Sequence, residues 1–216
     1  DLSSMYTAQN ITYDEFARPS YDLVVQGEIV NRITLGVTGE HNVYNSLAAI
    51  AAAHELGIRG EGIKNGLLRF TGTHRRFEKK GEIGGVTVID DYAHHPQEIA
   101  ATLAAAKNYP HREIWCVFQP HTYTRTKALM EDFAKALSVA DHVVLADIYA
   151  ARETDNLGIS SGTLAEKIAA FGTDTHYFPS FDAIETFLLE NCVNGDLLIT
   201  MGAGDIVKVG EKLLGQ

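Results

Sequence analysis

The sequence of 216 residues is long enough for one large domain, or for one domain and part of another. Hydrophobic residues make up 45% and charged residues 21% of it, the ordinary composition of a soluble globular protein. The formal net charge of −10 at pH 7 argues against a broad nucleic-acid-binding surface, which would gather lysine and arginine. A local phosphate site stays compatible with this charge, because it needs only a few cations and backbone N–H groups.

Cysteine usage and hydropathy favour a cytoplasmic protein without a zinc site or a membrane anchor. The two cysteines, Cys116 and Cys192, form no CxxC or Cys/His spacing. No apolar run approaches membrane length, and no signal peptide is present. Because the sequence starts at Asp1 in mid-pattern, without a methionine, we expect a fragment of a longer protein.

Residues 1–72 predict a small α+β unit. An alanine-rich helix begins at His41 and ends near Gly57, and a second helix covers about Glu61–Arg69. Before them come three short strand patterns, of which the last two form a hairpin: Asn10–Phe16, Tyr21–Val25 and Glu28–Leu35. Two helices after a small sheet indicate the end of a domain without its beginning.

The segment Phe70–Phe77, with the sequence FTGTHRRF, is the expected connector between two domains. We place the boundary near Gly72–His74. On composition alone, Arg75 and Arg76 are equally compatible with a functional role and with solvated linker charges.

From Phe77 onward, strand and helix patterns alternate. Helices are expected after Pro96, at about Arg125–Leu137 and Thr163–Ala170, around Phe187, and from Asp205 to Leu214. The strands are Phe77–Ile83, Val86–Ile89, Ile114–Phe118, Val143–Ala146, Thr175–Phe178 and Leu197–Thr200. Repeated βα units predict a Rossmann-like α/β fold with a doubly wound, mostly parallel sheet and right-handed crossovers.

Polar residues collect directly after four of the strands. Because carboxyl ends of parallel strands meet at one edge, these segments should line a single crevice, where open α/β sheets bind ligands. The segments are Asp90–His95, Gln119–Thr126, Asp147–Glu153 and Gly202–Asp205.

Several of these features have a simpler explanation. The pair His94–His95 could bind a metal, but adjacent side chains diverge and no third ligand has suitable spacing, so no metal ligand is assigned. The GxG at Gly202–Asp205 could contact phosphate, or it could be a tight turn with Asp205 as N-cap. Arg125 at a helix start opposes the helix dipole, which favours an anionic ligand there unless the side chain is simply exposed.

Asn42 and Asn45, three residues apart, are expected on the same side of the first helix. Paired side-chain amides can read a purine edge. An N-cap asparagine followed by a helix-surface asparagine explains the pair equally well.

Six stretches resemble the bacterial Mur ligase family in order and spacing, over about residues 39–205: GEHNVYNSLAAIAAA, FTGTHRRFE, GVTVIDDYAHHPQEIAATLAAA, FQPHTYTRT, DIYAARE and MGAGD. The resemblance implies an amino-terminal UDP-binding domain, a central ATPase domain and a carboxyl-terminal Rossmann-like domain. Residues 1–72 then correspond to the end of the central domain and 73–216 to the carboxyl-terminal domain. Since the P-loop, the magnesium-binding acids and the UDP domain are missing, the chain alone is expected to be inactive.

The reaction implied by the resemblance is ATP-dependent ligation of L-alanine to UDP-N-acetylmuramate through an acyl phosphate, a cytoplasmic step of peptidoglycan synthesis that serves cell shape and cell division. Mg²⁺ would be held mainly by the missing part of the central domain. The implied partners are those substrates, ATP and the missing domains of the same chain, with no nucleic acid and no membrane. The alternatives are a muropeptide-recycling ligase of the same superfamily and a non-catalytic nucleotide-binding module. A dinucleotide oxidoreductase is disfavoured because the glycine motif is incomplete.

The resemblance also carries site residues over to this sequence. Arg76, His94 and His121 match catalytic positions, Arg76 being aimed at the ATP phosphates when the domains close. Two positions depart from the family: Thr122 replaces a common arginine, and Arg152 stands where glycine is often found. The residues at the family's substrate-contacting positions are Tyr92, His121, Arg125 and Glu153. Those at its ATP-contacting positions are His41, Asn42, Asn45, Arg76 and Asp91.

Overall fold

The computed structural model describes residues 5–216, and the chain divides into two compact units, Asp1–Thr73 and His74–Gln216. The division falls in the segment where the composition predicts a boundary. Among residues 5–216, no helix is both long and apolar enough to cross a membrane.

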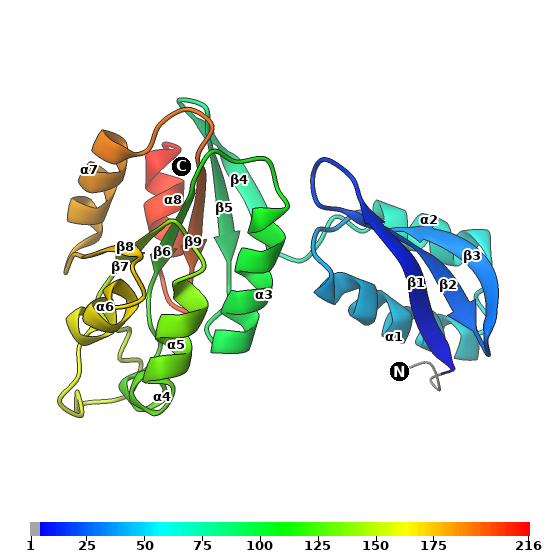
Figure 1. Ribbon diagram of the computed structural model, residues 1–216, viewed down its shortest axis with the longest axis horizontal. Coiled ribbons are helices and arrows are strands. Elements are labelled where there is room, and N and C mark those ends of the chain that lie inside the picture. The colour runs from blue at the N-terminus through cyan, green and yellow to red at the C-terminus, as the bar shows by residue number, and fades with distance from the viewer. Residues whose placement is uncertain (1–4) are drawn as a thin grey trace. The chain divides into compact units, whose positions relative to one another are not determined.

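The first unit is a three-stranded antiparallel sheet in the order β1-β2-β3, with two helices packed against it (Figure 1). The strands are β1 (Tyr6–Tyr13), β2 (Pro19–Val25) and β3 (Glu28–Thr34), and the helices are α1 (His41–Glu55) and α2 (Glu61–Arg69). Its core is built from alternate residues of β2 and β3 and from the inner faces of both helices. The buried Tyr21 hydroxyl lies 2.6 Å from the Ser46 hydroxyl, so the ring can be buried without leaving its oxygen unpaired.

The first strand lies earlier than predicted, at Tyr6–Tyr13 in place of Asn10–Phe16. The reason is a turn centred on Asp14, whose carboxylate accepts hydrogen bonds from the backbone N–H groups of Phe16 and Arg18 at 2.9 Å. An aspartate that caps its own turn in this way ends a strand. The β pattern of Tyr13 to Phe16 is therefore interrupted by side-chain chemistry that periodicity does not register.

The second unit contains a six-stranded sheet in the order β4-β5-β9-β6-β7-β8. Only the β4–β5 pair is antiparallel, which confirms the prediction of a mostly parallel, doubly wound sheet. The strands are β4 (Glu78–Ile83), β5 (Val86–Asp91), β6 (Ile114–Phe118), β7 (His142–Leu145), β8 (Asp174–Tyr177) and β9 (Leu197–Met201). The helices are α3 (Pro96–Lys107), α4 (Tyr123–Ala128), α5 (Met130–Leu137), α6 (Ser161–Ala169), α7 (Phe181–Asn191) and α8 (Val207–Leu213).

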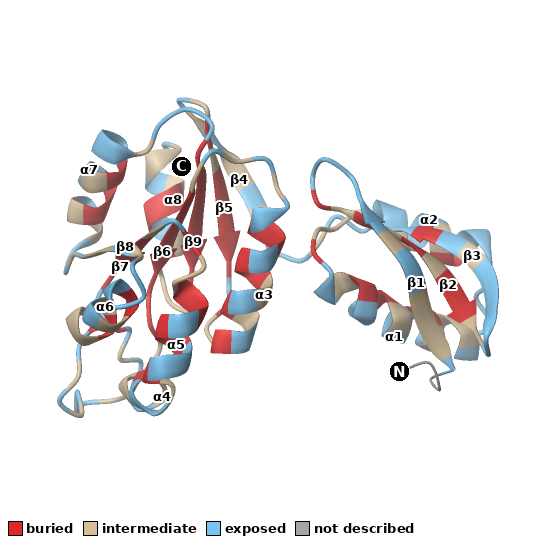
Figure 2. Ribbon diagram, viewed as in Figure 1, coloured by how far each residue is buried: buried red, intermediate tan, exposed pale blue. Residues whose placement is uncertain are grey.

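Helices cover both faces of this sheet. Helices α3, α5 and α6 bury their apolar faces on one side, with Leu103, Phe133 and Leu164 in one core cluster. Helices α7 and α8 pack on the other side, where Ile184 and Val209 join a second cluster. Figure 2 shows the central strands buried and the outer faces of the helices exposed. A strand buried on both faces reads as a continuous apolar run, as Ile114–Phe118 does.

Several boundaries in this unit differ from the sequence prediction by one or two residues, and three differences matter more. Strand β5 runs on to Asp91, so the two acids belong to the strand and not to the loop after it. The helix expected over Arg125–Leu137 is two helices that bend at Leu129, where φ is −115° and ψ is 22°. The last helix begins at Val207, and Asp205 does not cap it, because the Asp205 carboxylate is engaged by Gln119.

Candidate active site

Four polar loops meet at the carboxyl edge of the second sheet, as predicted. The loops after β6 and β7 are joined by the pairing of His121 with Tyr149 and by a 2.8 Å hydrogen bond from the Tyr149 N–H to the Pro120 carbonyl. The loop after β9 is tied to β5, since the Gly202 N–H donates to the Asp91 carbonyl at 3.0 Å. The edge is therefore a connected surface on which side chains from different strands have fixed spacings.

The glycine loop after β9 packs closely on Gln119. The Gln119 side chain donates to an Asp205 carboxylate oxygen at 3.1 Å and accepts from the Asp205 N–H at 3.0 Å. A Cβ on Gly204 would lie 2.2 Å from the Gln119 Oε1, and one on Gly202, where φ is +147°, would lie 2.8 Å from the Gln119 carbonyl oxygen. Gly202 is required by its φ and by the backbone oxygen, whereas a side chain at Gly204 would displace the Gln119 amide from Asp205. Close packing therefore explains the GxG motif without a ligand.

Aromatic and imidazole rings line the centre of the edge. The ring centroids of Tyr92 and His94 are 5.5 Å apart, those of His94 and His121 6.4 Å, and those of His121 and Tyr149 5.4 Å, the last pair stacked. The His94 Nδ1 lies 3.0 Å from the Tyr92 carbonyl oxygen, which orients that ring. The rings of His94 and His121, which were predicted to face the same crevice, therefore lie close together at this edge.

His121 carries a buried nitrogen without a partner. Within residues 5–216, the His121 Nδ1 is a buried side-chain nitrogen that makes no hydrogen bond. Burial, followed by the charges of Arg125 and His94, lowers the pKa of His121 from its ordinary value of 6.5. A neutral imidazole with an unused nitrogen can accept a proton from a bound amine at neutral pH.

The pKa of His121 gives a measurable prediction. In an NMR titration of this chain, we expect the His121 imidazole to titrate below 6.5, and the Arg125→Ala variant to raise that pKa by removing a nearby positive charge. Folding favours the neutral form of His121, because its pKa is lower in the folded chain than the ordinary value of 6.5. The stability that His121 contributes to the fold is therefore fully present above pH 6.5, and it is lost as the pH falls through the lowered pKa. The Lys127→Ala variant, which removes a charge from the same helix, should leave the titration unchanged. A wild-type titration at or above 6.5 would contradict the assignment.

Arg125 and Glu153 flank His121. The Arg125 guanidinium donates to the His121 carbonyl oxygen at 3.0 Å. The Glu153 carboxylate accepts from the Thr124 N–H at 3.1 Å and from the Thr124 hydroxyl, and these hydrogen bonds lower the pKa of Glu153. The dipole argument for an anion at Arg125 is wrong, because α4 has only six residues and Arg125 already lies in its last turn. The feature that favours an anion here is the positive charge of the Arg125 guanidinium, which lies beside His121 at the edge of the sheet.

Arg75, which composition could not separate from a linker charge, is firmly bound. Its guanidinium donates to the Asp90 carboxylate at 2.7 Å and to the carbonyl oxygens of Gly202 and Gly204 at 2.8 and 3.1 Å. The sequence did contain one signal for this contact. Asp90 and Asp91 stand at the end of an apolar strand, and a carboxylate that is buried there needs a cation as its partner. Arg76 is different: its side chain is 52% exposed and lies 3.7 Å from the Glu98 carboxylate.

Asp91 is almost fully buried, and both of its carboxylate oxygens are engaged. They accept from the N–H groups of Phe77 at 2.9 Å and Ala93 at 2.8 Å. Burial raises the pKa of Asp91, and these hydrogen bonds oppose that rise. Asp91 thus holds the end of the connector and the loop after β5 in place, which the sequence did not predict.

The asparagine pair of the first unit is preorganised. The Asn42 amide donates to the Thr38 carbonyl at 2.7 Å, and the Asn45 amide donates to the Asn42 Oδ1 at 3.0 Å. Glu40 occupies the N-cap position of α1, so the explanation of Asn42 as an N-cap is wrong. His41, the first residue of α1, is exposed beside the pair.

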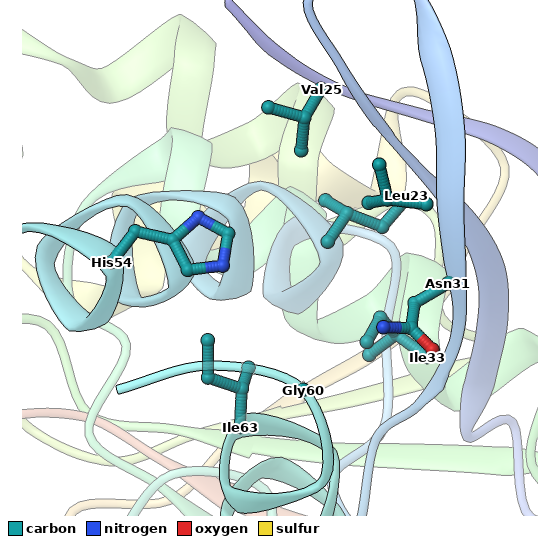
Figure 3. A pocket seen from close by; sticks show the side chains of 8 residues that line it. Leu23, Val25, Asn31, Ile33, His54, Gly60 and Ile63 are labelled. Atoms are coloured by element: carbon teal, nitrogen blue, oxygen red, sulfur yellow. The ribbon is translucent and has the colours of Figure 1, made fainter. Parts of the chain in front are cut away.

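The first unit also contains a cavity of about 230 Å³ that no predicted site residue lines (Figure 3). It is mostly apolar, and Asn31 and His54 are its polar side chains; the His54 Nδ1 lies 3.0 Å from the Tyr6 hydroxyl. The lining residues are Leu23, Val25, Val30, Asn31, Ile33, His54, Gly60 and Ile63. Across residues 5–216, no group of three or more His, Cys, Asp or Glu side chains could hold a metal ion.

Fold and site together define a Rossmann-like domain with imidazole, guanidinium and glycine-loop groups at the carboxyl edge of its sheet. A family-wide sequence profile described as "Mur ligase, glutamate ligase domain" matches residues 75–204. The chain belongs to the Mur ligase family, which confirms the resemblance seen in the motifs.

Relatives with high identity carry one functional name. The protein named UDP-N-acetylmuramate–L-alanine ligase in Lachnospira eligens is 64% identical over 211 residues, covering 98% of this chain and 46% of the relative. The one of the same name in Lachnoclostridium phytofermentans is 57% identical over 209 residues, covering 97% and 45%. The chain spans about half the length of the curated relatives it matches.

Solved structures agree on the fold. The UDP-N-acetylmuramate-alanine ligase of Thermotoga maritima superimposes with a TM-score of 0.83 at 28% identity, covering 98% of this chain and 45% of that structure. A murein peptide ligase from Psychrobacter arcticus gives a TM-score of 0.68 at 26% identity, covering 99% and 44%.

Proposed function

We propose that this chain is the carboxyl-terminal part of an ATP-dependent ligase that joins L-alanine to UDP-N-acetylmuramate through an acyl phosphate. The observation that carries the proposal is the 64% identity, over 98% of this chain, to a protein named for that reaction. Residues 1–73 would be the end of the central ATPase domain, and the unit that begins at His74 would be the carboxyl-terminal domain. Since ATP is a substrate, we place the reaction in the cytoplasm.

The carboxyl edge of the second sheet is the proposed L-alanine site. Arg125 would pair with the alanine carboxylate, because a guanidinium fork matches a carboxylate in a charge-assisted pair. His121 would accept the proton that the amine loses before attack, because its lowered pKa keeps the imidazole neutral at pH 7. Tyr92, His94 and Glu153 would line the same crevice.

Five residues are proposed as ATP contacts on the basis of the family resemblance. Asn42 and Asn45 would read the adenine edge with His41 beside them, and the hydrogen bond between the two amides supports a preset orientation. Arg76 would contact the transferred phosphoryl group, which its exposed guanidinium allows. Asp91 is kept as a ribose contact, although both of its oxygens already accept backbone hydrogen bonds. We place the Mg²⁺ ligands in the part of the ligase outside this chain.

The test is a reconstituted reaction with the full-length ligase. Incubated with ATP, Mg²⁺, UDP-N-acetylmuramate and L-alanine, it should release phosphate only when all four are present, and this chain alone should release none above background. If a cell-wall peptide with a free amino-terminal L-alanine replaces L-alanine with higher efficiency, the protein is a recycling ligase instead. ATP binding without any ligation would favour a nucleotide-binding module. Phosphate release by this chain alone would overturn the expectation that it is inactive.

A further inference from the structure

Arg75 connects three segments of the second unit at one point. Its guanidinium bonds the Asp90 carboxylate at the end of β5 and the carbonyl oxygens of Gly202 and Gly204 in the loop after β9. It also lies 4.9 Å from the centroid of the Tyr92 ring. The guanidinium therefore joins the connector, a strand end and the glycine loop.

The partner of this arginine is fully buried. The Asp90 side chain is 0% exposed, and its second oxygen accepts from the Thr200 hydroxyl at 2.7 Å. The Arg75 side chain is 14% exposed, so the ion pair is shielded from solvent. A buried carboxylate with a complete set of partners holds its neighbours in one geometry, because any displacement leaves a charge unpaired.

The backbone around Arg76 is held on both sides. Arg75 and Phe77 have φ values of +57° and +46°, which non-glycine residues rarely adopt. The Arg75 N–H donates to the Glu78 carboxylate at 2.8 Å, and the Phe77 N–H donates to the Asp91 carboxylate at 2.9 Å. Such conformations persist only where surrounding contacts determine them.

We propose that Arg75 is a positioning residue: by bonding Asp90, Gly202 and Gly204 together, it fixes the glycine loop and sets the place from which the exposed Arg76 side chain extends. The inference rests on the proposed function for the role of Arg76. A lysine at position 75 could keep the charge opposite Asp90. It could not bond three acceptors in one plane, because an ammonium lacks the rigid fork of a guanidinium.

The chain supplies a control for this idea at an arginine whose carboxylate partner is equally buried but whose own side chain is more exposed, 47% against 14%. Arg112 bonds a second buried aspartate, Asp196, with its Nε at 2.8 Å from the carboxylate, and Asp196 is also 0% exposed. This pair lies at the other end of the strands, since the Arg112 N–H bonds the Gly195 carbonyl just before β9. Arg112→Lys therefore tests the same chemical change away from the crevice.

The experiment compares Arg75→Lys with Arg112→Lys in the full-length ligase and in this chain. We expect both variants to fold, with the larger fall in Tm in Arg75→Lys, because the Arg75 side chain is the less exposed of the two. Only Arg75→Lys should lower kcat, by about tenfold to a hundredfold, with the KM for L-alanine little changed, because a misplaced phosphate contact acts in the transition state. In this chain, hydrogen exchange at the Phe77 and Asp205 amides should become faster in Arg75→Lys alone.

The outcomes separate this inference from the proposed function. Equal losses of kcat in the two variants, or unchanged kcat and exchange in Arg75→Lys, would overturn the positioning role. A wild-type ligase that does not use L-alanine would refute the proposed function, and the exchange comparison would then decide the positioning role by itself. If Arg75→Lys does not fold, the neutral pair Arg75→Gln with Asp90→Asn replaces it, with the same expected results.

Discussion

Replacing Arg76 with alanine is expected to lower the turnover number of the full-length ligase by about a hundredfold or more. Removing one group that stabilises charge in a transition state commonly has an effect of this size. The stability of the fold should change by only about 0.5 kcal/mol or less. The Arg76 side chain is half exposed, and its contact with Glu98 is 3.7 Å long, so little packing is lost.

Lys79→Ala is the matched control for Arg76→Ala. The Lys79 side chain is 49% exposed and lies 3.5 Å from the Glu82 carboxylate, so it resembles Arg76 in exposure and in the weakness of its ion pair. Steady-state kinetics of both variants, with thermal unfolding measured alongside, make the comparison. Wild-type turnover in Arg76→Ala would remove Arg76 from the phosphate site, and an equal loss in Lys79→Ala would show that the loss is not specific to Arg76.

The second large effect is expected at Arg125. In the full-length ligase, Arg125→Ala should raise the KM for L-alanine about tenfold to a hundredfold and leave the KM for ATP nearly unchanged. A charge-assisted hydrogen bond to a carboxylate contributes about 1.5–3 kcal/mol, and the alanine methyl group offers little binding energy to compensate. The measurement is initial rate as a function of each substrate at saturation with the others.

Lys127→Ala controls for the loss of a cation from the same short helix, because Lys127 bonds only the distant Leu157 carbonyl among the hydrogen bonds described for its side chain. It should keep the wild-type KM for L-alanine. A rise in the KM for ATP in Arg125→Ala, with that for alanine unchanged, would mean that the loop after β6 faces the nucleotide. The proposed amino-acid site would then be misplaced.

Much of the second unit could be predicted because its signals are local. Ile114–Phe118 is a continuous apolar run, and the two-residue period of Val86 and Val88 sets the strand before Pro96. The placement of polar loops at one edge followed from strand direction alone. By contrast, the bend at Leu129 and the early start of the first strand depend on single turns that hydrophobic periodicity does not distinguish.

The site was predicted by residue type better than by role. Tyr92, His94, His121 and Glu153 do lie on adjoining loops, and Arg125 lies in α4, directly after one of them. Asp91 and Arg75 take structural contacts that no motif showed. For Arg75 the reason is sequence distance, since Gly202 and Gly204 lie more than a hundred residues from it.

The sequence by itself determined the alternation of strands and helices, the parallel sheet and the loops that carry titratable groups, because these depend on periodicities within a few residues. Only the tertiary structure decided that β9 lies between β5 and β6, and therefore that the glycine loop meets Gln119 and Arg75. Strand order is chosen by the packing of the whole core, which joins segments far apart in the chain. The same packing takes Asp90 out of water, and burial converts Arg75 from a solvated charge into the cation that Asp90 requires.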